Sequence, residues 1–327
     1  MSIKSFYILI ALAISTFSVS AQTSDKAIGK FTGNHLLKHA SIGFCVKDLS
    51  GKQITSYNAF AARTPASTLK TITTATALEV LGGDYCYKTT LAKDVNNPNH
   101  LLIRGSGDPT LGTSRLDNDP TLFLIKWAKE IKQNIDTTQN IDITIIDDYF
   151  GYEGISERWI WQDMGIQYAA PAYGISIFDN TAKLHLNTMR RDTLPTILYC
   201  EPQMDMEYTN KLSLNTKGQD NGYVRGEPLS YKRILTGDIP AGREDFILKG
   251  DIPNPGLVLG QQLAEELAKN NIKINSINTT NDIYNASLRS GIKYTFDEDI
   301  FYTHLSPPLR DIIREINIES NNHYTEH

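Results

Sequence analysis

The sequence has little cysteine and no long run of basic residues. Its three cysteines, Cys45, Cys86 and Cys200, are odd in number and far apart, so they predict neither a disulfide framework nor a Cys-x-x-Cys metal site. Lys and Arg number 32 against 37 Asp and Glu, which gives 327 residues a formal net charge of −5. Because nucleic-acid-binding domains carry a basic patch, a nucleic-acid partner is not expected.

The chain also has no internal repeat, no low-complexity linker and no apolar run long enough to cross a membrane. The stretch from Phe6 to Phe17 is too short for a comfortable span. It follows Lys4 and leads into small residues that end at Ala21, a pattern typical of a secretory signal cleaved after Ala21. We therefore expect secretion across the inner membrane, a periplasmic location and membrane association that is at most peripheral. An uncleaved anchor is the alternative.

Hydrophobic residues make up 40% of the chain, enough for a sizeable core, and its length suggests about two domains. Helical spacing predicts one helix from Ser67 to Gly82, based on Leu69, Ile72, Thr76 and Val80. A second helix is expected from about Pro255 to Asn270, with Leu259, Leu263 and Leu267 on one face, and a third begins near Pro308. Two strands around Ser50-Gly51 are expected to form a hairpin.

Between about residues 89 and 249 short strand-like runs dominate, and one further helix, about Leu122 to Lys132, interrupts them. The expected organisation is therefore a signal peptide (1–21), the first part of a catalytic domain (22–88), one or more inserted domains (89–249) and the second part of the catalytic domain (250–327). The two end segments would form one discontinuous domain.

Ser67-Thr68-Leu69-Lys70 is the strongest local signal for chemistry. On a helix, positions i and i+3 share a face, so the Lys70 amine can lie beside the Ser67 hydroxyl. A serine needs a neighbouring base to become a nucleophile, and a lysine can act as that base. Free N–H groups at the start of the helix would face a developing oxyanion. Alone, this motif is weak and is more typical of an N-cap serine followed by a solvated lysine.

A wider set of motifs changes that balance. The sequence resembles the class C penicillin-binding proteins, the D-alanyl-D-alanine carboxypeptidase/endopeptidases, in order from about Ser41 to Glu326. The segments that carry the resemblance are 64–70 (TPASTLK), 102–111 (LIRGSGDPTL), 147–150 (DDYF), 159–163 (WIWQD), 168–171 (YAAP) and 316–322 (INIESNN).

The resemblance implies a role for each matching residue. Ser67 matches the acylated nucleophile and Lys70 its general base. Ser320 matches a second serine that relays a proton to the leaving amine, and Asn322 matches the amide that holds the substrate backbone.

The family's insertion contributes an acidic residue that meets the amine of diaminopimelate in the peptidoglycan stem, and Asp163 fits that place. Tyr168 would pack on the aliphatic chain of the same substrate. A solvated surface aspartate is the competing interpretation of Asp163.

One departure from the family is clear. Only five residues follow Asn322, so the Lys-Thr-Gly element expected downstream on a core strand is absent. We therefore expect a truncated or incomplete form of the family.

His323 to His327 spells His-x-x-Glu-His, an inverted zinc-peptidase pattern, but the chain ends before a third ligand could follow. Gly105-Ser106-Gly107 lacks the ending of a phosphate loop and favours a strand-to-turn corner. Trp159 and Trp161 could stack on a sugar, although a core position is more usual.

Together these observations predict an α/β domain of the serine β-lactamase/penicillin-binding transpeptidase type, incomplete and interrupted by a strand-rich insertion. The expected activity is that of a serine D-Ala-D-Ala carboxypeptidase/endopeptidase that cleaves stem peptides through a Ser67 acyl-enzyme, with β-lactams as covalent inhibitors and no metal or organic cofactor. A catalytically inactive peptidoglycan-binding module is the main alternative. A β-lactamase is a weaker one, because the interval between Ser67 and Ser320 is long.

Overall fold

A computed structural model describes residues 26–116, 119–151, 154–190, 193–290 and 295–327. The predicted signal peptide, residues 1–21, lies outside these ranges and stays a prediction. The chain divides into two compact units, Met1–Ala66 and Ser67–His327, which are taken separately below. Among the described helices, none combines the length and the apolar character that a membrane crossing requires.

The first unit contains the predicted hairpin. Strands β1 (Phe44–Lys47) and β2 (Gln53–Tyr57) pair antiparallel, after a helical segment at 26–32 and a short 3-10 turn, η1 (His35–Leu37). At the turn, the Asp48 carboxylate accepts hydrogen bonds from the backbone N–H groups of Ser50 and Lys52, each at 2.9 Å. Gly51 has a φ of 86°, a conformation that favours glycine. Local turn chemistry therefore accounts for the hairpin.

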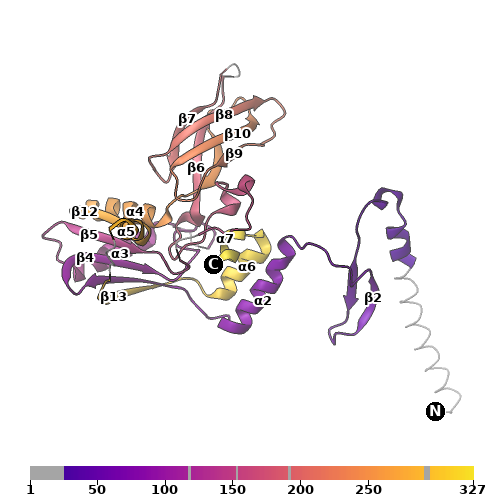
Figure 1. The fold of residues 1–327 in the computed structure, drawn as a ribbon, viewed down its shortest axis with the longest axis horizontal. Coiled ribbons are helices and arrows are strands. Elements are labelled where there is room, and N and C mark those ends of the chain that lie inside the picture. The colour runs from indigo at the N-terminus through magenta and orange to yellow at the C-terminus, as the bar shows by residue number, and fades with distance from the viewer. Residues whose placement is uncertain (1–25, 117–118, 152–153, 191–192, 291–294) are drawn as a thin grey trace, which may run out of the picture. The chain divides into compact units, whose positions relative to one another are not determined.

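The core of the second unit is a five-stranded sheet in the order β12-β5-β4-β3-β13 (Figure 1). Its strands are β3 (Lys88–Asp94), β4 (Asn97–Gly105), β5 (Ile141–Ile146), β12 (Ile274–Thr279) and β13 (Glu298–Leu305). β12, β5 and β4 run parallel, whereas β3 is antiparallel to both β4 and β13. Strands from residues 88–146 thus share one sheet with strands from residues 274–305. The domain boundaries expected from the sequence stay a prediction. This sheet combines strands that precede the expected boundary at residue 249 with strands that follow it.

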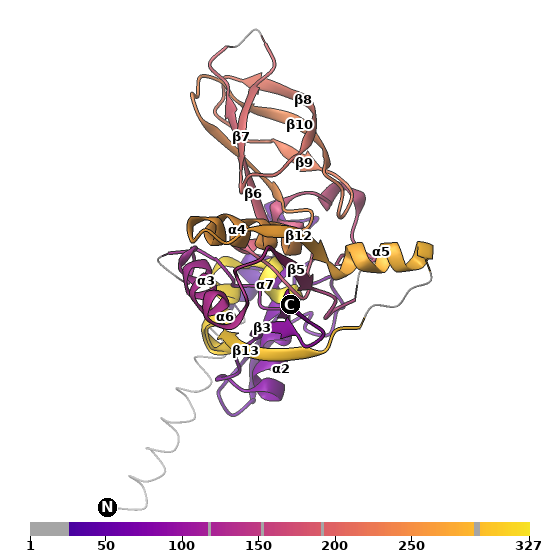
Figure 2. The same cartoon turned by 90° about the vertical axis from the view of Figure 1, so that its left-hand side faces the viewer.

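Helices α3 (Leu122–Asn134) and α4 (Pro255–Lys269) pack against each other and share one core with the sheet (Figure 2). The predicted spacing in α4 is confirmed, because Leu259, Leu263 and Leu267 are all fully buried. Asn254 caps α4 by accepting a hydrogen bond from the Leu257 N–H at 2.9 Å. α5 (Thr280–Ser290) follows β12. Apolar periodicity, predicted from the sequence, and a cap found in the structure therefore position this layer.

A smaller lobe is inserted between β5 and α4 (Figure 1). It consists of two three-stranded sheets, β11-β6-β7 and β8-β10-β9. The strands are β6 (Thr181–Asn187), β7 (Thr196–Glu201), β8 (Glu207–Asn215), β9 (Tyr223–Arg225), β10 (Lys232–Pro240) and β11 (Phe246–Asp251). Arg233 and Asp251 form an ion pair at 2.9 Å with side chains 0% and 1% exposed. This lobe confirms a strand-rich insertion.

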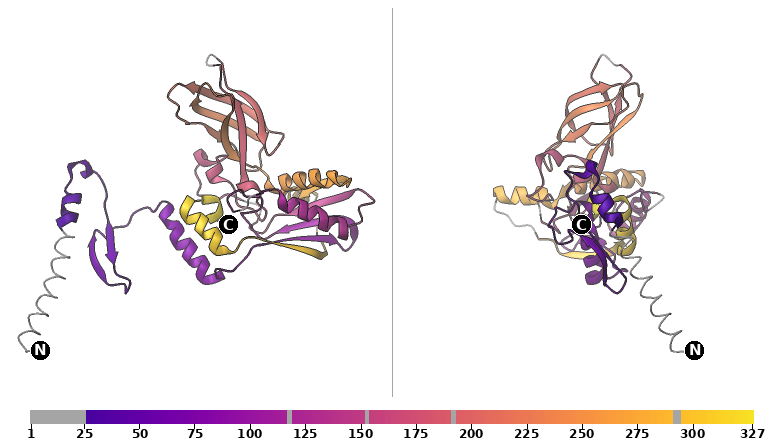
Figure 3. Two further views of the ribbon diagram at one scale, coloured as in Figure 1. Left: turned by 180° about the vertical axis from the view of Figure 1, so that it is seen from behind. Right: turned by 90° about the vertical axis from the view of Figure 1, so that its right-hand side faces the viewer.

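The remaining helices lie together, as the view from behind shows for α2 and α6 (Figure 3). A 3-10 turn, η2 (Ser67–Leu69), leads into α2 (Lys70–Leu81), which ends at Gly82 as predicted. α6 (Leu309–Glu319) and α7 (Asn322–Glu326) complete the group. Their small core contains Ile312, Ile316 and Tyr324.

The spacing that predicted α2 does not mark its buried face. Ile72 is 64% exposed and Val80 72% exposed, whereas the buried side chains of α2 are Lys70 and Thr74. The helix was correctly predicted, but its polar face is the one that packs inward.

The predicted strand-to-turn corner is present after β4. Gly107 has a φ of 88°, and its N–H donates to the carbonyl of Gly174 at 2.9 Å. At Gly105 a Cβ would collide with that same Gly174 carbonyl, so this corner needs glycine for close backbone approach.

Candidate active site

Ser67 and Lys70 are adjacent, as their spacing predicts. Ser67 opens η2 and Lys70 is the first residue of α2, so the two side chains lie one turn apart. Lys70 Nζ is 3.0 Å from Ser67 Oγ. Ser67 is exposed, whereas Lys70 is buried. An accessible hydroxyl beside a sheltered amine is the arrangement that a serine nucleophile and its base require.

Asn322 reaches the same amine from the other end of the sequence. Its Oδ1 accepts a hydrogen bond from Lys70 Nζ at 2.5 Å. Its Nδ2 donates to the backbone carbonyl of Tyr168 at 3.0 Å, which fixes the orientation of the amide. Residues 252 positions apart are therefore in direct contact.

Asp163 and Tyr168 continue this chain of hydrogen bonds. They belong to two short 3-10 turns, η3 (Trp161–Asp163) and η4 (Gln167–Ala169). The Tyr168 hydroxyl donates to Asp163 Oδ1 at 2.7 Å. Tyr168 itself is 44% exposed. The pKa of Tyr168 is raised to about 12, mainly by burial and to a smaller extent by the neighbouring Asp163 carboxylate. Asp163 is therefore a partly buried acceptor in contact with Tyr168.

Ser320 lies close in sequence but outside this set of bonds. It ends α6 in a left-handed conformation, with a φ of 55°, and its N–H donates to the Ile316 carbonyl. Its hydroxyl is exposed and makes no hydrogen bond within the described ranges. The structure thus joins five of the six predicted residues by hydrogen bonds and leaves the Ser320 side chain free to turn.

Residues that the sequence did not single out hold α7 in place. Asn321 caps the helix by accepting from the Tyr324 N–H at 3.1 Å. The buried Tyr324 hydroxyl donates to Asp179 at 2.6 Å and lies 2.8 Å from the Thr113 hydroxyl. Burial raises the pKa of Tyr324 far above its usual value. No local pattern in the sequence could have indicated these contacts, because the partners lie far apart along the chain.

The two histidines of the His-x-x-Glu-His pattern differ, because among the described residues both ring nitrogens of His323 are buried without a hydrogen-bond partner. His327 Nδ1 donates to the His323 carbonyl at 2.9 Å, and His327 Nε2 accepts from the Ser176 hydroxyl at 2.8 Å. Burial lowers the pKa of His327 to about 4 and that of His323 well below its usual value. Among the described residues, no three His, Cys, Asp or Glu side chains are grouped as metal ligands.

Two further details concern the neighbourhood of the site. Trp161 is 48% exposed, so the core position favoured for it from the sequence is wrong. Glu326 has its carboxyl pKa raised by burial, an effect that the charge of Lys70 opposes.

Comparison with known proteins agrees with this geometry. The pattern of the D-Ala-D-Ala carboxypeptidase 3 (S13) family matches residues 25–327. The chain belongs to this family. A D-alanyl-D-alanine carboxypeptidase of Actinomadura sp. (strain R39) is 23% identical over 304 residues, which cover 89% of this chain and 53% of that protein.

The fold is also that of a penicillin-binding protein. Penicillin binding protein 4 of Haemophilus influenzae superposes with a TM-score of 0.64 at 19% identity, over 84% of this chain and 58% of that one. A second structure of it, complexed with a β-lactam, gives a TM-score of 0.60 at 18% identity, over 88% and 59%. The expected α/β fold of penicillin-binding type is thus confirmed. The chain spans little more than half the length of these relatives.

Proposed function

We propose that this protein is a serine D-Ala-D-Ala carboxypeptidase/endopeptidase that acts on peptidoglycan stem peptides. The observation that carries the proposal is the Lys70 amine, which lies between Ser67 Oγ at 3.0 Å and Asn322 Oδ1 at 2.5 Å. The S13 family and the named carboxypeptidase relative support the same reaction class.

The contacts of Lys70 suit a general base. Because Asn322 Nδ2 is held by the Tyr168 carbonyl, its Oδ1 must accept a hydrogen from Lys70. A neutral Lys70 amine that donates to Asn322 can direct its lone pair at Ser67. It would then take the Ser67 proton as Oγ attacks the carbonyl carbon of the penultimate D-alanine.

The remaining steps follow from the same residues. Orphan N–H groups at the start of η2 and α2 would stabilise the oxyanion of the tetrahedral intermediate. The bond from the carbonyl carbon to the leaving amine then breaks, and Ser320 would relay the proton from Lys70 to that amine. Water hydrolyses the Ser67 ester, which releases the shortened stem peptide and restores the Ser67 hydroxyl.

Substrate recognition is assigned to the other predicted residues. Asn322 would hold the peptide backbone, and Asp163 would accept a charge-assisted hydrogen bond from the diaminopimelate amine. Tyr168, hydrogen-bonded to Asp163, would pack on the aliphatic part of that side chain. This substrate lies outside the cytoplasm, so the proposal includes cleavage of the signal after Ala21 and a periplasmic location.

Labelling with a fluorescent penicillin tests the proposal. A β-lactam acylates the same hydroxyl as the peptide, so wild type is expected to form a covalent adduct and Ser67→Ala to form none. Ser213→Ala is the control, because it changes an exposed serine of β8 that has no part in the site, and acylation should stay unchanged. Labelling that survives Ser67→Ala would exclude Ser67 as the nucleophile. No labelling of wild type would instead indicate a peptidoglycan-binding module.

A further inference from the structure

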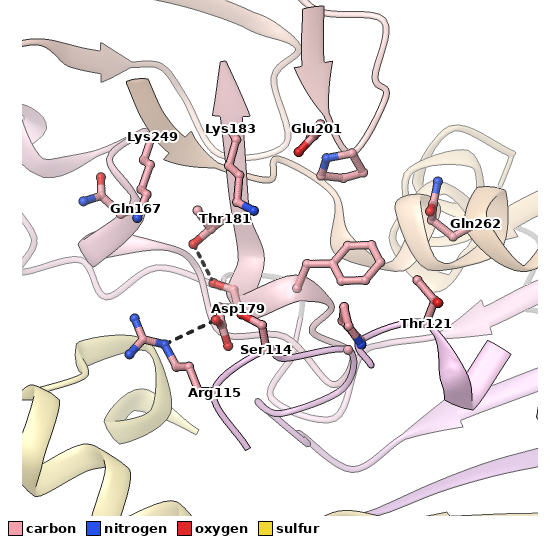
Figure 4. A pocket seen from close by; sticks show the side chains of 14 residues that line it. Ser114, Arg115, Thr121, Gln167, Asp179, Thr181, Lys183, Glu201, Lys249 and Gln262 are labelled. Atoms are coloured by element: carbon pink, nitrogen blue, oxygen red, sulfur yellow. Dashed lines mark hydrogen bonds and ion pairs between the residues drawn. The ribbon is translucent and has the colours of Figure 1, made fainter. Parts of the chain in front are cut away.

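A second cavity in the Ser67–His327 unit contains none of the residues assigned to catalysis. Its volume is about 550 Å³, within the range of roughly 300–1,000 Å³ typical of small-molecule sites. Three parts of the chain line it: the segment before α3, the sheet β11-β6-β7, and α4 through Gln262 (Figure 4). Gln167 of η4 contributes from the side of Tyr168.

Two lysines line one face of this cavity. Lys183 of β6 and Lys249 of β11 are direct cross-strand partners, and both are exposed. Figure 4 shows their side chains extending from neighbouring strands in the same direction, toward Gln167 and Thr181. Like charges opposite each other destabilise a sheet. Neither ammonium has a hydrogen bond or an ion pair anywhere in the described parts of the chain. An anion placed between them would remove that repulsion.

Of the other charged groups of the cavity, Arg115 is already ion-paired and Glu201 carries a negative charge. Arg115 pairs with Asp179 at 3.3 Å and with Glu315 at 2.8 Å, so its charge is balanced. Glu201 is the cross-strand partner of Lys183 on its other side, and its carboxylate lies 3.6 Å from His185 Nε2. The cavity therefore presents two free cations and, beside them, one carboxylate.

The wall of the cavity is also strained. Phe178, Asp179 and Asn180 have φ angles of 54°, 56° and 45°, in the left-handed region that non-glycine residues rarely adopt. The fully buried Asn180 holds this turn by accepting from the Ile177 N–H at 3.1 Å and donating to the Pro171 carbonyl at 2.9 Å. Strained segments that their surroundings hold in place cluster at functional sites. Phe178 and Asp179 of this segment line the cavity.

We propose that this cavity binds a second stem peptide through its carboxylates, separately from the peptide cleaved at Ser67. Lys183 and Lys249 would bind the carboxylates, and Gln167 and Gln262 would pair with peptide amides. Glu201 would accept from a free amine of the ligand. This proposal rests on the proposed function for the identity of the peptide, and on the cavity itself for the position and sign of the charges.

The test measures peptide binding to the full chain by calorimetry. The probe is the tripeptide L-Ala-γ-D-Glu-meso-diaminopimelate. One variant combines Lys183→Gln with Lys249→Gln, and a second carries Asp163→Asn alone. The control is Lys211→Gln. Lys211 is an exposed lysine of β8 that does not line the cavity. The double lysine variant should raise the Kd of one binding event about tenfold or more. Lys211→Gln should leave the Kd unchanged, and penicillin labelling should be unaltered in both.

The outcomes separate this proposal from the proposed function. Binding that is lost with Asp163→Asn but unaffected by the lysine changes would overturn the cavity as a peptide site and leave the catalytic assignment intact. Binding that depends on both lysines in a protein that penicillin does not label would support the cavity and reject the catalytic assignment. Equal binding of the tripeptide with its carboxyls amidated would overturn the proposal. Displacement of the tripeptide by millimolar inorganic phosphate would also overturn the proposal, because it would indicate an unspecific anion site.

Discussion

The five-stranded sheet and the helices around Ser67 belong to one unit but are held together by different contacts. In the sheet, Leu101, Leu102 and Ile103 are all 0% exposed, and Trp127 of α3 is equally buried. In α2, by contrast, the buried side chains are Lys70 and Thr74, and apolar ones such as Ile72 are exposed. Apolar burial therefore stabilises the sheet, whereas in α2 the buried side chains are polar and Lys70 is held by specific hydrogen bonds.

This difference separates stability from function. Burial of apolar area is nondirectional and tolerates small shifts, while a hydrogen bond is lost when its geometry changes. The contact from Lys70 to Asn322 places the proposed base and an amide within a hydrogen-bond length of each other. A substitution in the site should thus affect chemistry more than unfolding, and one in the sheet should do the reverse.

The largest effect is expected for Lys70→Ala. Loss of a positioned general base typically slows a reaction roughly 10²–10⁴-fold, so penicillin acylation should slow by that factor. Because Lys70 does not contact the core of the sheet, thermal unfolding of the sheet should change little. Single-turnover acylation kinetics and calorimetry measure the two quantities. A near-normal rate of acylation would show that the base lies elsewhere.

Trp127→Ala tests the other region. The side chain is fully buried and packs edge-to-face on Phe123 with ring centroids 5.1 Å apart, so its truncation should lower the free energy of unfolding by about 3–5 kcal/mol. The indole N–H has no acceptor among the described residues. Trp127→Phe, the control, removes this unsatisfied donor and should therefore cost less.

Denaturant titration gives both unfolding energies, and penicillin labelling per folded molecule should stay constant. Loss of labelling in proportion to stability would contradict the separation of the two regions.

The same two regions show how far the sequence could predict the structure. α4 was predicted with its buried face, because Leu259, Leu263 and Leu267 repeat at the period of the helix. The pairing of β3 with β13 could not be predicted, because their register depends on residues such as Leu91 and Tyr302 that lie far apart in the chain. Local order was therefore visible in the sequence, and sheet order was not.

The site divides in the same way. Ser67 and Lys70 are neighbours through helix geometry alone, so their spacing was sufficient. Asn322 and Asp163 could be connected with them only through family resemblance, since no spacing rule spans such intervals. The contact of Tyr324 with Asp179 had no signal at all, because it depends on how α7 docks.

Asp163→Asn sharpens the comparison within the site itself. A charge-assisted hydrogen bond contributes about 1.5–3 kcal/mol, so turnover of diaminopimelate-containing peptides should fall roughly ten- to a hundredfold. Penicillin has no such amine and should acylate at an unchanged rate. Tyr168→Phe is the matched control, because it removes the hydroxyl that donates to Asp163 and keeps the carboxylate.

The control should lose less peptide turnover than Asp163→Asn does. Equal losses of peptide turnover and penicillin acylation in the aspartate variant would indicate a folding defect. No loss in either would make Asp163 an ordinary surface residue.

Ile72→Ser should have the smallest effect, although it replaces a large apolar side chain in the helix that follows Ser67, the proposed nucleophile. Ile72 is 64% exposed, so little burial is lost, and exposed substitutions typically change the unfolding free energy by no more than about 0.5 kcal/mol. Ile103→Ser is the matched control in β4, fully buried, where the same change should cost several times more. Denaturant titration of both variants compares the regions directly. A loss at Ile72 as large as that at Ile103 would show that α2 is stabilised by apolar burial after all, and that its polar contacts are not what holds Lys70 in place.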